Sequence, residues 1–237
     1  MTRGVSENQK QLLKVVFTAI LAGLALVVGY IEIRWPIAPW LKLDFSEVII
    51  LLSLIMIGFS HTLGVIVIRS VIRWLITADS TNIPFPFFGE TVAIIASIVV
   101  VLVYMLANFI FRDNDYELAK SKERRFPYPK LRNETAIRVF KDVGKIVFVT
   151  IILAAFMVAI NFFIVTPSFA SQGQHIFFTS FVNSGDYAGM IGGTGLRNYT
   201  IFVTTLYGPF NLLKFASCLI IFTIIKKQLV KVIDLRP

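Results

Sequence analysis

Asn211 and Lys214 stand near the start of an otherwise apolar run, YGPFNLLKFASCLIIFTIIKKQLV, residues 207–230. Because helix residues three apart share a face, their amide and ammonium groups are expected to point to the same spot. A lysine deep in a membrane span costs about 2.5–3.5 kcal/mol, so it normally faces a partner, a cavity or water. Pro209 suits the first turn of a helix, where its missing N–H needs no acceptor. These residues predict a binding site for a polar small molecule, at a helix N-terminus near the membrane surface.

The composition is that of an integral membrane protein. Hydrophobic residues make up 56% of the 237 residues and charged residues only 16%. Since a spanning helix needs about 20 apolar residues, the sequence predicts an all-α membrane protein, a single domain over residues 1–237 with six transmembrane helices. The block from 48 to 76 is too long for one span and contains Gly58, Ser60 and His61, so we expect two short helices joined by a tight turn. The spans are expected at about 12–33, 46–59, 61–76, 89–111, 140–165 and 200–225.

Basic residues predict that both termini are cytoplasmic, because short loops rich in Lys and Arg stay on that side. Of the 23 Lys and Arg residues, three precede the first span, ten lie between 112 and 145 and four follow the last span. This topology makes 112–139 a cytoplasmic loop and 166–199 a long outer loop. The net charge of +9 then reflects orientation and anionic lipids rather than nucleic acid. We expect a multi-pass protein of a bacterial cell membrane.

Residues for catalysis or metal binding are sparse. Cys218 is the single cysteine, so no disulfide framework or cysteine-based metal cluster forms within this chain. His61 and His175 fall on opposite predicted sides of the membrane, which excludes a dyad. The sequence contains no G-x-x-x-x-G-K-[ST] loop for ATP. A channel would need polar residues at all depths, whereas polarity here concentrates at the outer ends. An intramembrane enzyme or a channel therefore ranks below a binding and transport protein.

Five segments, in order along the chain, resemble one family of transport proteins. They are LKLDFSEVIILL (41–52), VIRSVIRWLITA (67–78), FFGETVAIIAS (87–97), INFFIVTPSF (160–169) and YGPFNLLK (207–214). They are similar to the substrate-binding S components of energy-coupling factor (ECF) vitamin transporters, most closely the riboflavin-transporter-like branch that includes pantothenate-type members. The resemblance covers nearly all of residues 12–230. It implies a six-helix bundle with an outward-facing vitamin pocket and both termini inside.

The resemblance also implies partners. An S component captures a vitamin outside, associates with a membrane coupling subunit (the T component) and two cytoplasmic ATPases, and topples to deliver the vitamin inward. ATP and magnesium then belong to the ATPases, and no cofactor is expected in this chain. Small residues on the first span, Ala19-x-x-x-Gly23 and Ala25-x-x-x-Gly29 with Ala22 between them, permit close helix approach. We expect Ala19, Ala22 and Gly23 to dock the coupling subunit, with packing inside the bundle as the alternative.

For the substrate site, the resemblance implies that Asn161, Asn211 and Lys214 hold the vitamin. The alternative role is interhelical hydrogen bonding. Amides both donate and accept, which suits a flavin ring edge or a pantothenate amide. Lys42 and Asp44 are expected either to orient the substrate or to pair with each other, and the sequence leaves both roles open.

Arginines and aromatic residues complete the predicted site. Trp40 belongs to an outer aromatic set that could stack on an isoalloxazine ring, although Trp and Tyr also populate membrane interfaces for unrelated reasons. Arg69 and Arg73 share a helix face and each need an anion. We expect structural ion pairs with nearby carboxylates, whereas an unpaired arginine would hold a substrate carboxylate. The candidate carboxylates are Asp44, Glu47, Asp79 and Glu90, the last also expected to cap its helix. Pantothenate has a carboxylate and riboflavin has none; riboflavin is the expected substrate and pantothenate the alternative.

Overall fold

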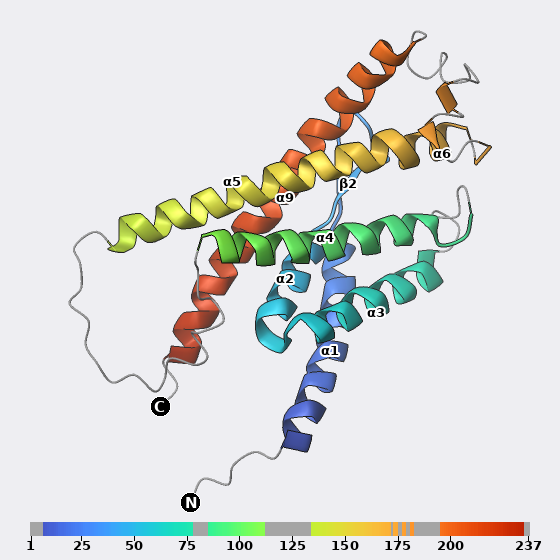
Figure 1. The fold of residues 1–237 in the computed structure, drawn as a ribbon. Coiled ribbons are helices and arrows are strands. Elements are labelled where there is room, and N and C mark those ends of the chain that lie inside the picture. The colour runs from blue at the N-terminus through green and yellow to red at the C-terminus, as the bar shows by residue number, and fades with distance from the viewer. Residues whose placement is uncertain are drawn as a thin grey trace, which may run out of the picture.

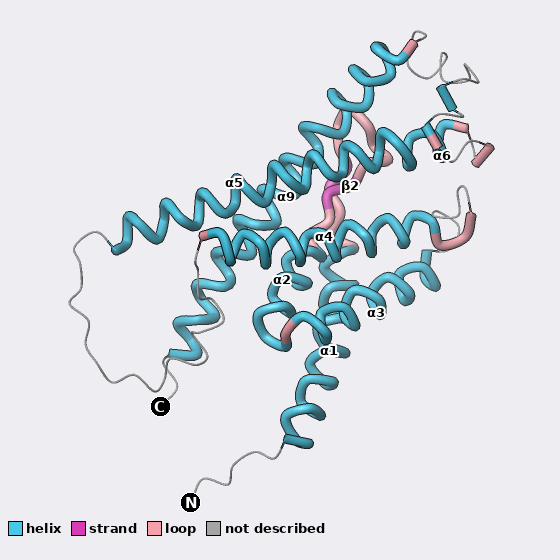
Figure 2. The backbone as a smooth tube through the Cα atoms, viewed as in Figure 1, coloured by secondary structure: helices cyan, strands magenta, loops and turns pink. Residues whose placement is uncertain are grey.

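The computed structural model describes residues 7–77, 85–111, 134–171, 173–174, 177–178, 181–182 and 195–234. Nearly all of this part of the chain is helical (Figures 1 and 2). The long helices are α1 (Glu7–Gly29), α2 (Ser46–Ile57), α3 (Phe59–Thr77), α4 (Phe88–Ile110), α5 (Glu134–Ile160) and α9 (Leu196–Asp234). A π-helical segment, η3 (Asn161–Val165), and a short helix, α6 (Thr166–Ala170), continue α5.

Five helical segments are long and apolar enough to cross a membrane: α1, α3, α4, α9 and the continuous segment from α5 to α6. α2 has twelve residues and is shorter than a full span. The all-helical membrane fold predicted from the hydropathy is therefore confirmed. The placement of both termini in the cytoplasm stays a prediction.

The expected break in the block from 48 to 76 is confirmed. α2 ends at Gly58, whose φ of 85° and ψ of 170° are open to glycine but strained for other residues. The carbonyl of Gly58 then accepts hydrogen bonds from the backbone N–H of Thr62 at 3.1 Å and its hydroxyl at 3.0 Å. Ser60 and His61 lie in the first turn of α3, so the turn is one residue long. α2 and α3 can therefore fold back on each other.

The last helix is longer than predicted, and the assignment of Pro209 to a first turn is wrong. α9 begins at Leu196 and carries Pro209 in its interior. Proline there removes one intrahelical hydrogen bond. The helix persists because its buried face, formed by Tyr199, Val203, Leu206 and Phe210, runs without interruption past the proline. Asn211 and Lys214 thus stand in mid-helix, with no helix N-terminus beside them.

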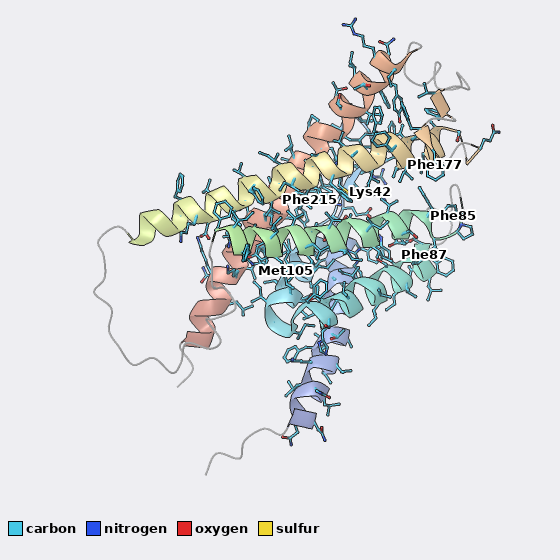
Figure 3. All side chains as sticks on the ribbon, in the orientation of Figure 1. Lys42, Phe85, Phe87, Met105, Phe177 and Phe215 are labelled. Carbon is cyan, nitrogen blue, oxygen red and sulfur yellow. The ribbon has the colours of Figure 1, made fainter. Side chains whose placement is uncertain are left out.

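The helices pack around an apolar core. α5 contacts α9 and α4, while α1 contacts α2 and α3 (Figure 1). Core residues come from α1 to α5 and from α9, and a smaller cluster joins Ala38 and Phe181 to the first half of α9. Large apolar side chains also point outward along the long helices, as expected for helices surrounded by lipid. Phe85, Phe87 and Phe177 gather at one end of the bundle (Figure 3).

Candidate functional site

A short hairpin between α1 and α2 brings the polar residues of the amino-terminal half to α9. Its strands are β1 (Ile33–Arg34) and β2 (Lys42–Leu43), paired antiparallel. Ala38, at the hairpin tip, is fully buried in the small cluster that contains Tyr199 and Tyr207 of α9. The Trp35 ring meets the Phe210 ring edge-on, with centroids 5.8 Å apart. The hairpin therefore lies against the first half of α9, one turn from Asn211 and Lys214.

Asp44, just after β2, is the acceptor for the Lys214 ammonium. Lys214 Nζ lies 2.9 Å from Asp44 Oδ2, and both side chains are largely buried. Asp44 Oδ1 accepts the hydroxyl of Ser46 at 2.5 Å and its backbone N–H at 3.2 Å, while the Cys218 thiol approaches the Asp44 carbonyl at 3.6 Å. Burial raises the pKa of the Asp44 carboxyl, but the charge of Lys214 and the Ser46 hydroxyl outweigh burial and hold that pKa well below its usual range.

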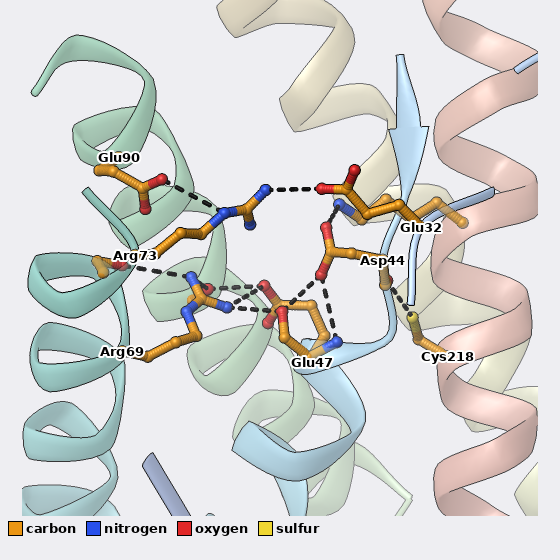
Figure 4. Close-up of polar contacts among 11 residues, drawn as sticks. Glu32, Asp44, Glu47, Arg69, Arg73, Glu90 and Cys218 are labelled. Atoms are coloured by element: carbon orange, nitrogen blue, oxygen red, sulfur yellow. Dashed lines mark hydrogen bonds and ion pairs between the residues drawn. The ribbon is translucent and has the colours of Figure 1, made fainter. Parts of the chain in front are cut away.

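Arg69 of α3 joins three helices through buried polar groups. Its side chain is only 2% exposed. Nη1 donates to Ser46 Oγ at 2.7 Å and lies 3.7 Å from Glu47 Oε1. Nη2 donates to Ser70 Oγ at 3.4 Å and to Ser97 Oγ at 3.3 Å, and the Ser97 hydroxyl donates to Glu47 Oε1 at 2.6 Å. The guanidinium thus binds groups on α2, α3 and α4 at once (Figure 4).

Arg73, one turn along α3, extends this set to the hairpin. Its guanidinium lies 3.1 Å from Glu32 Oε1 and 3.6 Å from Glu90 Oε1. Glu32 Oε2 is in turn 2.6 Å from Lys42 Nζ. We call these charged residues the polar cluster; it contains four carboxylates and four cations: Glu32, Asp44, Glu47, Glu90, Lys42, Arg69, Arg73 and Lys214. By formal charge, the acidic and basic side chains of the polar cluster are therefore equal in number. Figure 4 shows the contacts of its arginines with Glu32, Glu47 and Glu90.

These contacts decide two predictions about ion pairs. The expectation that Arg69 and Arg73 form structural ion pairs is confirmed. The pairing of Lys42 with Asp44 is wrong, because Lys42 is half exposed and binds Glu32, whereas Asp44 is buried against α9. Glu90 lies in the first turn of α4, as its predicted capping role requires, and it also binds Arg73.

The two amides of the predicted site use their nitrogens within their own helices. Asn161 Nδ2 donates to the Met157 carbonyl at 2.7 Å, and Asn211 Nδ2 donates to the Tyr207 carbonyl at 2.8 Å. Both residues are buried. Neither bond is interhelical. Among the described residues, no donor reaches the Oδ1 atom of either amide, so both oxygens remain open as acceptors.

The two tryptophans of the hairpin differ in burial, and the predicted stacking of Trp40 on a ligand ring stays a prediction. Trp40 is 62% exposed, whereas Trp35 is partly buried against Phe210. The indole Nε1 of Trp35 is buried and has no hydrogen-bond partner in the described structure. Sequence reasoning also missed Ser46, although a serine two residues after an aspartate at a helix start is a signal that could have found it. Nothing in the sequence marks Glu32 as the residue that joins Lys42 to Arg73.

The small residues of α1 divide between two faces. Ala19 and Gly23 are exposed, and a Cβ on Gly23 would meet nothing within 4 Å. Ala22 is 1% exposed and belongs to the core, so it lies off the surface that a partner helix would meet. Ala25 is also buried, and Gly29 packs against the Ser46 side chain. Of the small residues on α1, Ala19 and Gly23 are thus accessible to a partner helix, and docking there stays a prediction, while Ala22, Ala25 and Gly29 pack inside the bundle.

Comparison with known proteins identifies the family through a family model and the fold through a solved structure. A family model described as "ECF transporter, substrate-specific component" matches residues 13–226. A solved structure described as "Structure and mechanism of the S component of a bacterial ECF transporter" is similar with a TM-score of 0.55 and 17% identity, over 94% of this chain and 98% of that chain. No curated protein matches. At this identity the structural likeness shows the fold alone, while the family model spans nearly all of the chain. The chain therefore belongs to the family of membrane-embedded, substrate-specific components of ECF transporters.

Proposed function

We propose that this chain is a riboflavin-binding S component, which captures the vitamin outside and passes it inward through a coupling subunit and two ATPases. One observation carries the choice of riboflavin. Arg69 and Arg73, the residues best suited to a carboxylate, both have carboxylate partners. Lys214 is likewise held by Asp44. A pantothenate carboxylate would have to displace one of these acids, whereas uncharged riboflavin needs no counter-charge.

Three neutral groups on the hairpin, η3 and α9 suit the edge of a flavin ring. That edge carries an N–H donor flanked by two carbonyl acceptors. Asn211 and Asn161 each have an Oδ1 atom that lacks a donor in the described structure. The Trp35 N–H lacks an acceptor. Of these groups, the Trp35 N–H is buried without a partner in the described structure, which is unfavourable, so a ligand acceptor that satisfies it gains affinity.

The test is direct titration of the detergent-purified chain with riboflavin and with pantothenate. We expect saturable riboflavin binding, quenching of flavin fluorescence and no comparable binding of pantothenate. Reconstituted alone in vesicles, the chain should bind without ATP-driven accumulation. Tighter binding of pantothenate, or no flavin binding, would reject the assignment.

Replacing each of two buried asparagines in turn tests where riboflavin binds. Asn211→Ala should weaken riboflavin binding by about 10-fold, since it removes a hydrogen-bond acceptor worth about 1.5 kcal/mol. Asn108 of α4 is equally buried but accepts a hydrogen bond from Lys145 at 2.8 Å. Asn108→Ala should therefore lower stability and leave the riboflavin dissociation constant unchanged. Equal loss of affinity in both variants would contradict the proposed site.

A further inference from the structure

We infer that Asp44 is a specificity-determining residue: by holding the Lys214 ammonium, it makes this site select uncharged ligands over anionic ones of the same shape. The inference rests on the proposed ligand-binding role of Asn211 and Lys214. It explains in addition why the positively charged Lys214 does not bind an anionic ligand.

Because Lys214 is paired with Asp44, its ammonium can donate hydrogen bonds to neutral acceptors but does not attract an anion. An ammonium has three N–H donors, and one lies 2.9 Å from Asp44 Oδ2. Within the described residues, this is the one hydrogen bond that Lys214 makes. The remaining N–H groups can donate to a ligand carbonyl or hydroxyl. A ligand carboxylate or phosphate at the same place would stand next to the Asp44 carboxylate, and like charges at such distances repel strongly away from water.

Asp44 is fixed, so it cannot turn away to free the lysine. Its Oδ1 atom accepts the hydroxyl and the backbone N–H of Ser46. The Ser46 hydroxyl accepts from Arg69 Nη1 at 2.7 Å. A continuous line of donors thus runs from Arg69 through Ser46 to Asp44, and it leaves Oδ2 aimed at Lys214 (Figure 4). Turning the carboxylate away from Lys214 would break both of its hydrogen bonds to Ser46.

No neighbouring cation in the polar cluster can take over the charge of an anionic ligand. Arg69 pairs with Glu47, and Arg73 pairs with Glu32 and Glu90. Lys42 pairs with Glu32. With four carboxylates against four cations, an added anion would leave the polar cluster with an excess negative charge. Removing the Asp44 charge is the smallest change that leaves Lys214 without a carboxylate partner and therefore able to bind an anionic ligand.

The experiment is a charge series measured with matched neutral and anionic ligands. The variants are Asp44→Asn, Lys214→Met and the double variant Asp44→Asn/Lys214→Met. The ligand pairs are pantothenol with pantothenate, which have nearly the same shape and differ in charge, and riboflavin with riboflavin 5′-phosphate, which adds a charged phosphate to the ribityl chain. For each detergent-purified protein, calorimetric titration gives the ratio of the anionic to the neutral dissociation constant in whichever pair binds.

We expect the parent to prefer the neutral member. Asp44→Asn should shift the ratio toward the anion by about 10-fold or more, since a freed ammonium gains a charge-assisted hydrogen bond. Lys214→Met should shift the ratio the other way, because Asp44 then stands alone. The double variant is again balanced in charge, so its ratio should return close to that of the parent. It also tests the inference if a single variant folds poorly.

Asp142→Asn is the matched control. This variant removes the same charge and also breaks an ion pair, because Asp142 Oδ2 lies 2.7 Å from Lys227 Nζ. That ion pair, however, joins α5 to the far part of α9. The ratio should not change. A parent that prefers the anion, or an Asp44→Asn ratio equal to that of the parent, overturns the inference while riboflavin binding by the parent still supports the proposed function. A parent that binds neither pair overturns both.

Discussion

Replacing Arg69 by methionine tests whether the polar cluster stabilises the helix bundle. Arg69→Met keeps an apolar stem of similar length and removes the guanidinium. The Arg69 side chain is 2% exposed and that of Glu47 is 7% exposed. Without its cation, the Glu47 carboxylate would remain buried with only the Ser97 hydroxyl as a partner. Three serines would also lose the donor that they share.

The expected loss of unfolding free energy depends on how deeply the ion pair is buried rather than on its N–O distance. Removing one member of a buried ion pair costs about 3–5 kcal/mol, because the other charge is left uncompensated. Lys227→Met breaks a pair with a shorter separation, 2.7 Å against 3.7 Å for Arg69 and Glu47. The Lys227 side chain, however, is 53% exposed. An exposed pair is worth about 0–1 kcal/mol after solvent screening, so the closer pair should matter less.

Reversible unfolding in mixed micelles, followed by circular dichroism, would measure both variants. Glu47→Gln in the Arg69→Met background removes the stranded charge and keeps an acceptor for Ser97. It should recover about 2 kcal/mol or more of the loss. If Arg69→Met unfolds like Lys227→Met, or if Glu47→Gln gives no recovery, the ion pair is not what stabilises this part of the bundle.

Three further predictions follow from single contacts. Gly58→Ala should lower the free energy of unfolding by about 1–3 kcal/mol, because the φ of 85° at this position is strained for alanine. Gly23→Ala, with open space around the added Cβ, should raise it by about 0.5–1 kcal/mol. The melting curves of the two variants must therefore move in opposite directions. Tyr199→Phe should lose about 0.5–1.5 kcal/mol of stability in the same assay, because the Tyr199 hydroxyl donates a partly buried hydrogen bond to the Phe162 carbonyl at 2.7 Å. An unchanged melting curve would show that water replaces this bond. Ala19→Trp, on an exposed face, should lower transport by the assembled complex without changing the riboflavin dissociation constant; loss of riboflavin affinity would instead mark internal packing.

Features set by neighbouring residues could be predicted from the sequence. The approximate positions of the long helices follow the apolar runs, although their ends do not. The break before α3 falls at Gly58, where glycine permits a backbone that other residues avoid. The shared face of Asn211 and Lys214 likewise follows from helical spacing alone. The same local logic failed at Pro209. Its preference for a first turn was overridden by the buried apolar face that continues on both sides of it.

The partners of the charged residues could not be predicted, because they depend on the fold. Asp44 and Lys214 are 170 residues apart in sequence. Lys42 is nearer to Asp44 along the chain, yet the hairpin presents Lys42 to Glu32 and Asp44 to α9. Trp35 and Trp40 have equal aromatic character in the sequence, and the contact of Trp35 with Phe210 alone separates them. In each case several partners of the right chemistry were within reach, and tertiary packing chose among them.

The short α2 helix explains why so many charges are paired inside this bundle. Twelve residues rise about 18 Å, whereas the hydrocarbon core of a bilayer is about 30 Å thick. If Gly58 lies at one membrane surface, the start of α2 lies about 12 Å short of the other. Asp44, Ser46 and Glu47 are at that start, so their charges are at a depth where an unpaired ion is costly. Balanced pairing lets the helices enclose polar groups there. It leaves the neutral groups of Asn211, Asn161 and Trp35 outside the ion pairs, available to the ligand that we propose.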